Sequence, residues 1–100
     1  MIKINDPVIA VLQSPREKIW GVLREINPAG IFVRGVELSS FENLVRAAAA
    51  DNTFYGLSEQ FIPMWRVERV SKDEPDGDIP ATFEEFENRT GESFSNFFAE

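Results

Sequence analysis

The chain has 100 residues and a formal net charge of −7, with 43% hydrophobic and 27% charged residues, as expected for one globular domain. It contains no cysteine and no histidine, which excludes disulfides, thiolate chemistry and imidazole as a base or metal ligand. None of its 17 acidic residues stands out as part of an acid–base pair, so we expect no enzyme, no metal and no cofactor.

We see neither a membrane-spanning apolar segment nor a signal peptide in the sequence. No apolar run approaches the roughly 20 residues that span a bilayer. The first residues lack the apolar region and the cleavage site of a signal peptide. We therefore expect no membrane contact and a cytoplasmic location.

The negative charge is concentrated towards the end of the sequence. Residues 1–70 carry eight basic and eight acidic side chains, whereas residues 71–100 carry two basic and nine acidic ones. Such a chain lacks the broad basic field that drives non-specific binding of nucleic acids. Local basic patches on residues 1–70 remain compatible with this distribution.

A β-hairpin organises the first third of the chain. Strands are predicted over residues 18–26 and 31–38, and the Asn-Pro-Ala-Gly sequence between them is typical of a turn. An apolar, β-branched run over residues 7–12 predicts a strand before the hairpin. Gly21 and Gly35 lie inside the two hairpin strands, where glycine marks a bend, a bulge or a close approach of backbones. Their positions favour a strongly bent sheet that closes into a small barrel.

A helix and two short strands are predicted next. Ser39 and Glu42 have the spacing of a capping box, and apolar residues at helical spacing follow, so we expect a helix over residues 40–50. The strand-like run that follows is interrupted by Pro63, which cannot donate to a ladder. It is therefore divided into strands 60–62 and 66–70, joined by a tight turn.

The end of the chain divides into an acidic linker and a phenylalanine-rich helical segment. Residues 71–81 are polar, and an Asp-Glu-Pro-Asp-Gly-Asp stretch there fails the ligand spacing of a calcium loop. Residues 82–98 form either one helix or two short helices with Gly91 as a C-terminal cap, and Thr82 with Glu85 forms a second capping box. This segment packs on its own barrel, on a second subunit or in a partner's groove.

Two groups of residues are candidates for interaction. Aromatic and arginine side chains are typical of interface hot spots and base-stacking sites, which selects Trp65, Arg66, Arg69 and Arg34 for a protein or RNA contact. The alternative places Trp65 in the core and pairs the neighbouring arginines with Glu68 or the acidic tail. Candidates for self-association are Phe94, Phe97 and Phe98.

The order of strands resembles that of a small SH3-like barrel of the Sm-like type. The likeness covers roughly residues 7–70 and lies in three stretches, Lys18-Ile-Trp-Gly-Val-Leu, Gly30-Ile-Phe-Val-Arg-Gly and Phe61-Ile-Pro-Met-Trp-Arg-Val-Glu-Arg-Val. In Sm-like proteins a glycine bends the second strand, at the place of Gly21 here. The turn between the last two strands often carries RNA contacts there, and Pro63 to Arg66 occupy that place. The usual N-terminal helix has no room, the helix over 40–50 is inserted, and the RNA-binding loop signatures are not matched.

We therefore expect a mainly β fold with helices: a bent antiparallel barrel of five strands over residues 1–70, followed by the linker and the helical segment on the same domain or on a partner. The expected function is a non-catalytic, bacterial-type interaction module that self-associates or docks a protein partner. The Sm-like resemblance implies ring or dimer assembly. The alternative is a single-stranded RNA-binding protein, which the acidic charge disfavours.

Overall fold

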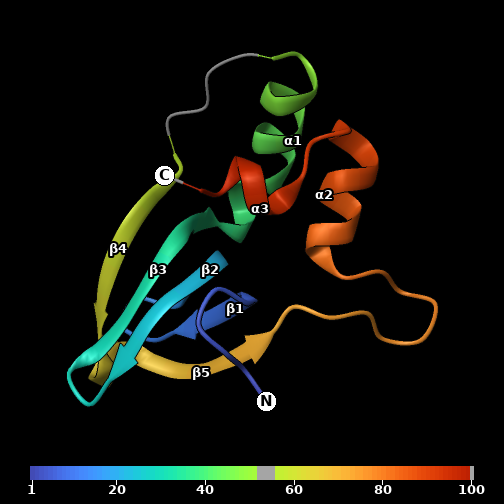
Figure 1. Ribbon diagram of the computed structural model, residues 1–100. Helices are drawn as coiled ribbons and strands as arrows, with labels where there is room; N and C mark the ends of the chain where they lie inside the picture. Colours follow the sequence, from blue (N-terminus) through green and yellow to red (C-terminus); the bar gives the residue numbers. More distant parts are fainter. Residues whose placement is uncertain (52–55, 100) are drawn as a thin grey trace.

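The computed structural model describes residues 1–51 and 56–99 and contains a five-stranded sheet with three α-helices on one side of it (Figure 1). In chain order the elements are β1 (Pro7–Leu12), β2 (Glu17–Asn27), β3 (Gly30–Glu37), the 3-10 turn η1 (Leu38–Ser40), α1 (Phe41–Ala49), β4 (Ser58–Pro63), the 3-10 turn η2 (Met64–Arg66), β5 (Val67–Lys72), α2 (Thr82–Thr90) and α3 (Phe94–Phe97).

All neighbouring strands of the sheet are antiparallel, in the order β4-β3-β2-β1-β5. The predicted class, a β fold with helices, is confirmed, and the predicted strands lie within one to two residues of the observed ones at most ends. The sheet is not closed, however, where the sequence predicts a barrel. The reason is that β4 pairs with β3 and β5 with β1, whereas β4 and β5 are joined by η2 without a ladder between them.

The bend of the sheet has a local cause in the two central glycines. Gly21 and Gly35 are opposite one another in the β2–β3 register. A Cβ atom added to Gly21 would lie 2.1 Å from the carbonyl oxygen of Arg34, and one on Gly35 would lie 2.3 Å from that of Trp20. Only glycine allows this approach of the two backbones. Register shifts at Leu23/Glu25 on β2 and at Val11/Leu12 on β1 add to the curvature.

Two apolar clusters lie on opposite faces of the sheet. The helix-side core joins strands β2 and β3 to all three α-helices and consists of Trp20, Val22, Val36, Phe41, Leu44, Val45, Ala48, Phe86, Phe94 and Phe98. The inner core lies within the curve of the sheet and consists of Val8, Ala10, Leu12, Ile19, Leu23, Ile31, Val33 and Ile62.

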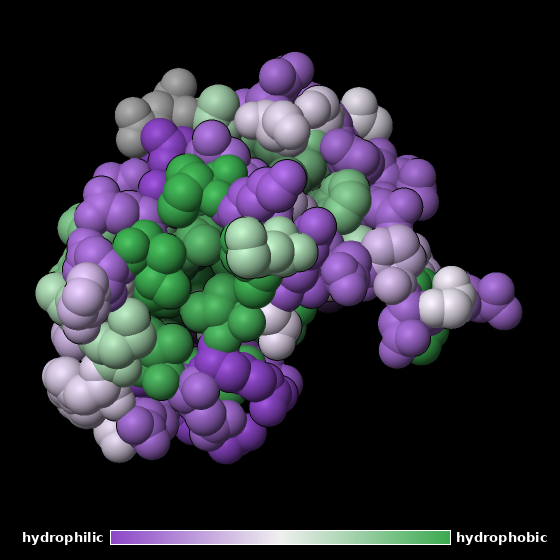
Figure 2. Space-filling model, turned by 60° about the horizontal axis from the view of Figure 1, so that its bottom comes forward, coloured by the Kyte–Doolittle hydropathy of each residue, from purple (hydrophilic) through white to green (hydrophobic). Residues whose placement is uncertain are grey.

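The inner core has no α-helix packed against it among the described residues. Partly buried side chains packed against it are Ile2, Met64, Val67 and Val70. Figure 2 shows a continuous apolar area surrounded by polar side chains on the lower side of the molecule. The N-terminal residues are held next to β2, because the Asn5 amide donates to the Leu23 carbonyl at 2.7 Å.

The helical segment at the end of the chain consists of two helices. Gly91 ends α2 with φ 75°, and its amide donates to the Glu87 carbonyl, which decides between the two predicted forms. Both helices pack on the sheet of the same chain through the helix-side core. The predicted Ser39 capping box is wrong, because α1 follows η1 directly and its N-cap, Ser40, makes no side-chain bond. No helix within residues 1–51 and 56–99 is long and apolar enough to cross a membrane.

Candidate interaction surfaces

Trp65, one of the predicted contact residues, is exposed, with 64% of its surface accessible. Its backbone is held in η2 by Gln13, whose side-chain amide donates to the Trp65 carbonyl at 2.7 Å and whose backbone amide donates to that of Arg66 at 2.8 Å. The alternative that places Trp65 in the core is wrong. The tryptophan in the core is Trp20, which has no exposed surface. The structure therefore presents an aromatic side chain on a fixed turn.

Arg66, beside Trp65, is used within the chain. Its guanidinium donates to the carbonyl groups of Gln13 at 3.0 Å and Pro15 at 2.8 Å, and to the carboxylate of Glu17 at 2.7 Å. These bonds fix the β1–β2 loop against η2. Because the Arg66 guanidinium donates to three acceptors of its own chain, it stabilises the shape of this surface and has few N–H groups left to bind a ligand.

Arg34 and Arg69 lie on separate parts of the sheet. The Arg34 Nε donates to the Phe98 carbonyl at 3.0 Å, which ties β3 to the end of the chain. Arg69 is exposed on β5, and two strands, β2 and β1, lie between β3 and β5 in the sheet. The four predicted contact residues are therefore not brought together: Trp65 and Arg66 share η2, whereas Arg34 and Arg69 lie elsewhere.

The three predicted self-association residues lie against their own sheet. Phe94 is 4% exposed and Phe98 is 1% exposed, with ring centroids 5.3 and 4.9 Å from that of Trp20. Phe97 is partly buried, and its ring centroid lies 5.2 Å from that of Phe86. These aromatic side chains contribute to the helix-side core of this chain.

The two edge strands, β4 and β5, form a further candidate interaction surface, for which the sequence predicts no individual residues on β4. On β4, Glu59 and Phe61 are in register with Arg34 and Phe32, so they lie on the outer face, away from the inner core. Phe61 is 47% exposed and its ring lies 5.0 Å from that of Phe32. In the sequence, the only indication of this is that alternate side chains of a strand point to opposite faces, which places Glu59 and Phe61 on the same face of β4.

The second edge strand, β5, has the same division between its faces. Val70 is in register with Ala10 of the inner core, so it faces inward, whereas Arg69 is in register with Val11 and faces outward. Val67 also packs against the inner core. Both edges therefore combine apolar side chains inside with charged side chains outside.

A carboxyl pair lies in a cleft of about 370 Å³ between the start of β2 and the end of β3. The Arg66 guanidinium and a hydrogen bond from Glu37 lower the pKa of Glu17. The bond to Glu17 and its negative charge raise the pKa of Glu37. The remaining lining residues are Arg16, Lys18 and Ser39. Among the described residues, no group of three acidic side chains has the arrangement of a metal site.

Comparisons with known proteins give no match. A scan against protein-family models, a search of curated proteins and a search of solved structures find no significant relative of this chain. The function is therefore argued from the surfaces described above.

Proposed function

We propose that the chain is a non-catalytic, cytoplasmic interaction module that associates with further copies of itself through the two open edges of its sheet. The observation that supports this most is that β4 and β5 both end the sheet and have no ladder on their outer sides within the described residues. Unpaired amide and carbonyl groups of an edge strand are a template for pairing with another strand.

The charges on the two edges favour pairing of β4 of one copy with β5 of the next. Glu59 lies on the outer face of β4, and Arg69 lies on the outer face of β5. A β4–β5 pair places these opposite charges on the same face, whereas two β4 strands bring two Glu59 side chains together. On the inner face, Ile62 of β4 meets Val67 or Val70 of β5, which extends the apolar inner core across the contact.

Such an interface is heterologous, so it generates a ring when the rotation closes and a filament when it does not. Ring or dimer assembly is also what the Sm-like resemblance implies. Trp65 lies between the two edges on η2, where its exposed ring adds apolar contact area beside the paired strands.

The oligomeric mass tests the proposal. Sedimentation velocity from low to high micromolar concentration is expected to show assembly for the unchanged chain. Glu59→Lys and Arg69→Glu each weaken assembly, and the two changes together restore it, because the charges are exchanged rather than lost. Lys18→Glu, which reverses one exposed charge on the internal strand β2, is the matched control and leaves assembly unchanged. A chain that stays monomeric at high micromolar concentration contradicts the proposal.

Single-stranded RNA binding is the second candidate, and the exposure of Trp65 supports it. Two of its three candidate arginines, Arg34 and Arg66, donate to acceptors of the chain itself, which weakens the case. Titration with oligouridine at low ionic strength distinguishes the two functions. Binding that falls with salt and is lost in Trp65→Ala favours RNA, whereas the interaction module shows no binding.

A further inference from the structure

The loop between β5 and α2 projects away from the body of the molecule (Figure 1). We call residues 74–80 the acidic arm, because they include Glu74, Asp76 and Asp78 and no basic residue. Every residue of the arm is exposed. Nevertheless, it carries a large apolar side chain, Ile79, with 67% of its surface accessible.

The acidic arm has a fixed shape. It leaves the body at Asp73, which is 4% exposed, and returns at Ala81, which is 2% exposed. At its tip the backbone groups of Asp76 and Ile79 exchange two hydrogen bonds of 2.9 and 3.0 Å. Gly77 between them has φ 59°, which glycine adopts without strain. Because the loop is already ordered, docking of Ile79 costs little further conformational entropy.

A groove with a complementary surface lies between α1 and α2. It has a volume of about 400 Å³. Its apolar part consists of Val45, Ala49 and Ala50, and its polar rim consists of Glu42, Arg46 and Arg89. The small alanine side chains leave room for an apolar group between the two arginines.

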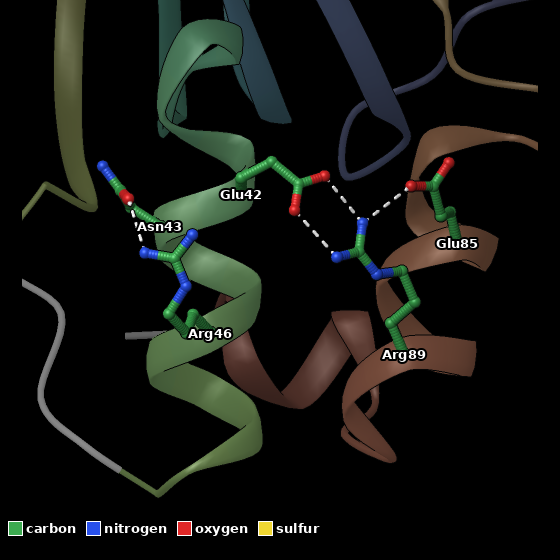
Figure 3. A network of polar contacts seen from close by, with 5 residues as sticks. All are labelled: Glu42, Asn43, Arg46, Glu85 and Arg89. Atoms are coloured by element: carbon green, nitrogen blue, oxygen red, sulfur yellow. Dashed lines mark hydrogen bonds and ion pairs between the residues drawn. The ribbon is translucent and has the colours of Figure 1, made fainter.

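The two arginines of the rim differ in their partners (Figure 3). Arg89 bonds the carboxylate of Glu42 at 2.8 Å twice and that of Glu85 at 3.1 Å. Arg46 donates to the neutral amide of Asn43 at 3.4 Å and is exposed. Arg46 is therefore the rim cation that an incoming carboxylate meets first.

We propose that the acidic arm of one copy docks in the α1–α2 groove of a second copy. Ile79 lies against Val45 and Ala49, and the carboxylates beside it pair with Arg46. Complementary charge supports a second copy as the occupant, since one chain carries both an acidic tip with an apolar side chain and an apolar groove whose rim presents Arg46. The contact uses neither edge of the sheet, so it is independent of the edge pairing.

Docking of the acidic arm in the groove of its own chain is opposed by the geometry. The arm enters α2 at Thr82, and Arg89 lies seven residues further along the helix, about 10 Å at 1.5 Å per residue. The ends of the arm are fixed at Asp73 and Ala81, and Ile79 is exposed in the single chain. The groove of a neighbouring molecule therefore remains as the partner surface.

Disulfide trapping tests this contact directly, because the chain has no cysteine of its own. An Ile79→Cys chain is mixed with an isotope-labelled Ala49→Cys chain, oxidised mildly and weighed by mass spectrometry. We expect the mixed disulfide at a yield at least tenfold above that of an Ile26→Cys chain with the same Ala49→Cys partner. Ile26 is 54% exposed and lies outside the arm, which makes it the matched control.

Charge exchange completes the experiment. Arg46→Glu in the Ala49→Cys chain is expected to lower the yield, and Asp76→Lys with Asp78→Lys in the Ile79→Cys chain is expected to restore it. Equal yields from Ile79→Cys and Ile26→Cys chains overturn the arm contact. Edge pairing is tested separately, by the oligomeric mass of the Glu59 and Arg69 variants. A failure of the arm contact in the disulfide experiment therefore does not contradict edge pairing.

Discussion

The indole Nε1 of Trp20 donates a hydrogen bond of 3.0 Å to the Oδ2 of Asp73, 53 residues later in the chain. The same carboxylate accepts the backbone amides of Thr82 at 2.7 Å and Phe83 at 2.8 Å. One buried side chain thus joins the central aromatic residue of the helix-side core, the end of β5 and the first turn of α2. Its two oxygens accept hydrogen bonds from three N–H donors, so the buried polar atoms of this side chain have partners.

Replacement of Asp73 by alanine is expected to lower the free energy of unfolding by about 2–4 kcal/mol. The change leaves the Trp20 indole N–H buried without this acceptor and removes the acceptor of the first two backbone amides of α2. Asp73→Asn keeps one acceptor oxygen and is expected to have an intermediate effect. Urea unfolding followed by circular dichroism measures the loss.

The control for this prediction is Asp78→Ala, which removes an exposed aspartate from the acidic arm and is expected to change stability by less than about 0.5 kcal/mol. Equal stability of the Asp73 and Asp78 variants would show that the buried carboxylate does not hold the helical segment on the sheet.

Much of this fold is predictable from local sequence, and the Trp20–Asp73 pair shows where such prediction ends. The β2–β3 hairpin follows from two β-rich runs and a turn. The sequence predicts Gly91 as one possible helix end, because that prediction needs only the residues next to it. The bond between Trp20 and Asp73 joins distant residues, so nothing local indicates which tryptophan is buried. The capping of α2 by Asp73 is missed for the same reason.

The candidate site was less predictable than the fold. Trp65 is a candidate by its residue type alone and is exposed, but Arg66 and Arg34 donate to acceptors that lie far away in the sequence. Closure of the sheet depends on whether β4 and β5 meet in space, and the strand patterns are the same for an open and a closed sheet. The sequence pattern of the strands therefore does not predict whether β4 and β5 are open edges; this is determined by how the strands are arranged in the fold.

The ion pair Glu42–Arg89 joins α1 to α2 at the surface, beside the apolar contact of the two helices in the helix-side core (Figure 3). The Arg89 guanidinium lowers the pKa of Glu42, and the two carboxylates around Arg89 raise the pKa of that arginine. A double-mutant cycle with Glu42→Gln and Arg89→Gln is expected to give a favourable coupling energy at pH 7. Because the folded-state pKa of Glu42 is lowered from 4.5, the coupling is present above pH 4.5 and is lost as pH falls through the lowered value.

Salt provides a second measurement on the same pair. Both side chains reach solvent, so the coupling energy is expected to decrease as sodium chloride is raised from low concentration to about 1 M. Arg46→Gln, which changes a neighbouring arginine bonded to Asn43, serves as the matched control. A double-mutant cycle of Arg46→Gln with Glu42→Gln is expected to give a smaller coupling energy than the cycle of Arg89 with Glu42. A coupling energy independent of both pH and salt would contradict an ionic contact.

The carboxyl pair Glu17–Glu37 is expected to titrate in two separated steps. The pKa of Glu37 is raised from 4.5 because its protonated form hydrogen-bonds to the Glu17 carboxylate and because the charge on Glu17 opposes its ionisation. The pKa of Glu17 is lowered from 4.5 because its carboxylate accepts a hydrogen bond from Arg66. The raised pKa of Glu37 means that the folded chain binds more protons there, so its contribution to stability falls as pH rises from 4.5 through the raised value.

Carbon-13 NMR of the side-chain carboxyl groups measures both steps. Glu17→Gln is expected to return the pKa of Glu37 towards 4.5, because it removes the carboxylate that accepts the hydrogen bond of Glu37 and, with it, the neighbouring charge. Glu68→Gln removes a carboxylate that pairs instead with Arg16 and should leave Glu37 unchanged. A Glu37 titration that is insensitive to Glu17→Gln would show that the two groups are not in contact.

The Gly21–Gly35 pair gives the strongest expected effect of a single methyl group. In Gly21→Ala the new Cβ would lie 2.1 Å from the Arg34 carbonyl oxygen and 2.6 Å from the Gly35 Cα, both of them backbone atoms. Backbone cannot rotate away as a side chain does, so β2 and β3 must separate where the sheet bends. We expect a loss of about 3 kcal/mol or more in the free energy of unfolding. Gly77→Ala, where the added Cβ meets no atom within 4 Å but φ is 59°, is expected to cost only about 1 kcal/mol. Urea unfolding of the two variants side by side measures the difference, and similar losses would mean that the two strands do not approach as closely as the structure has them.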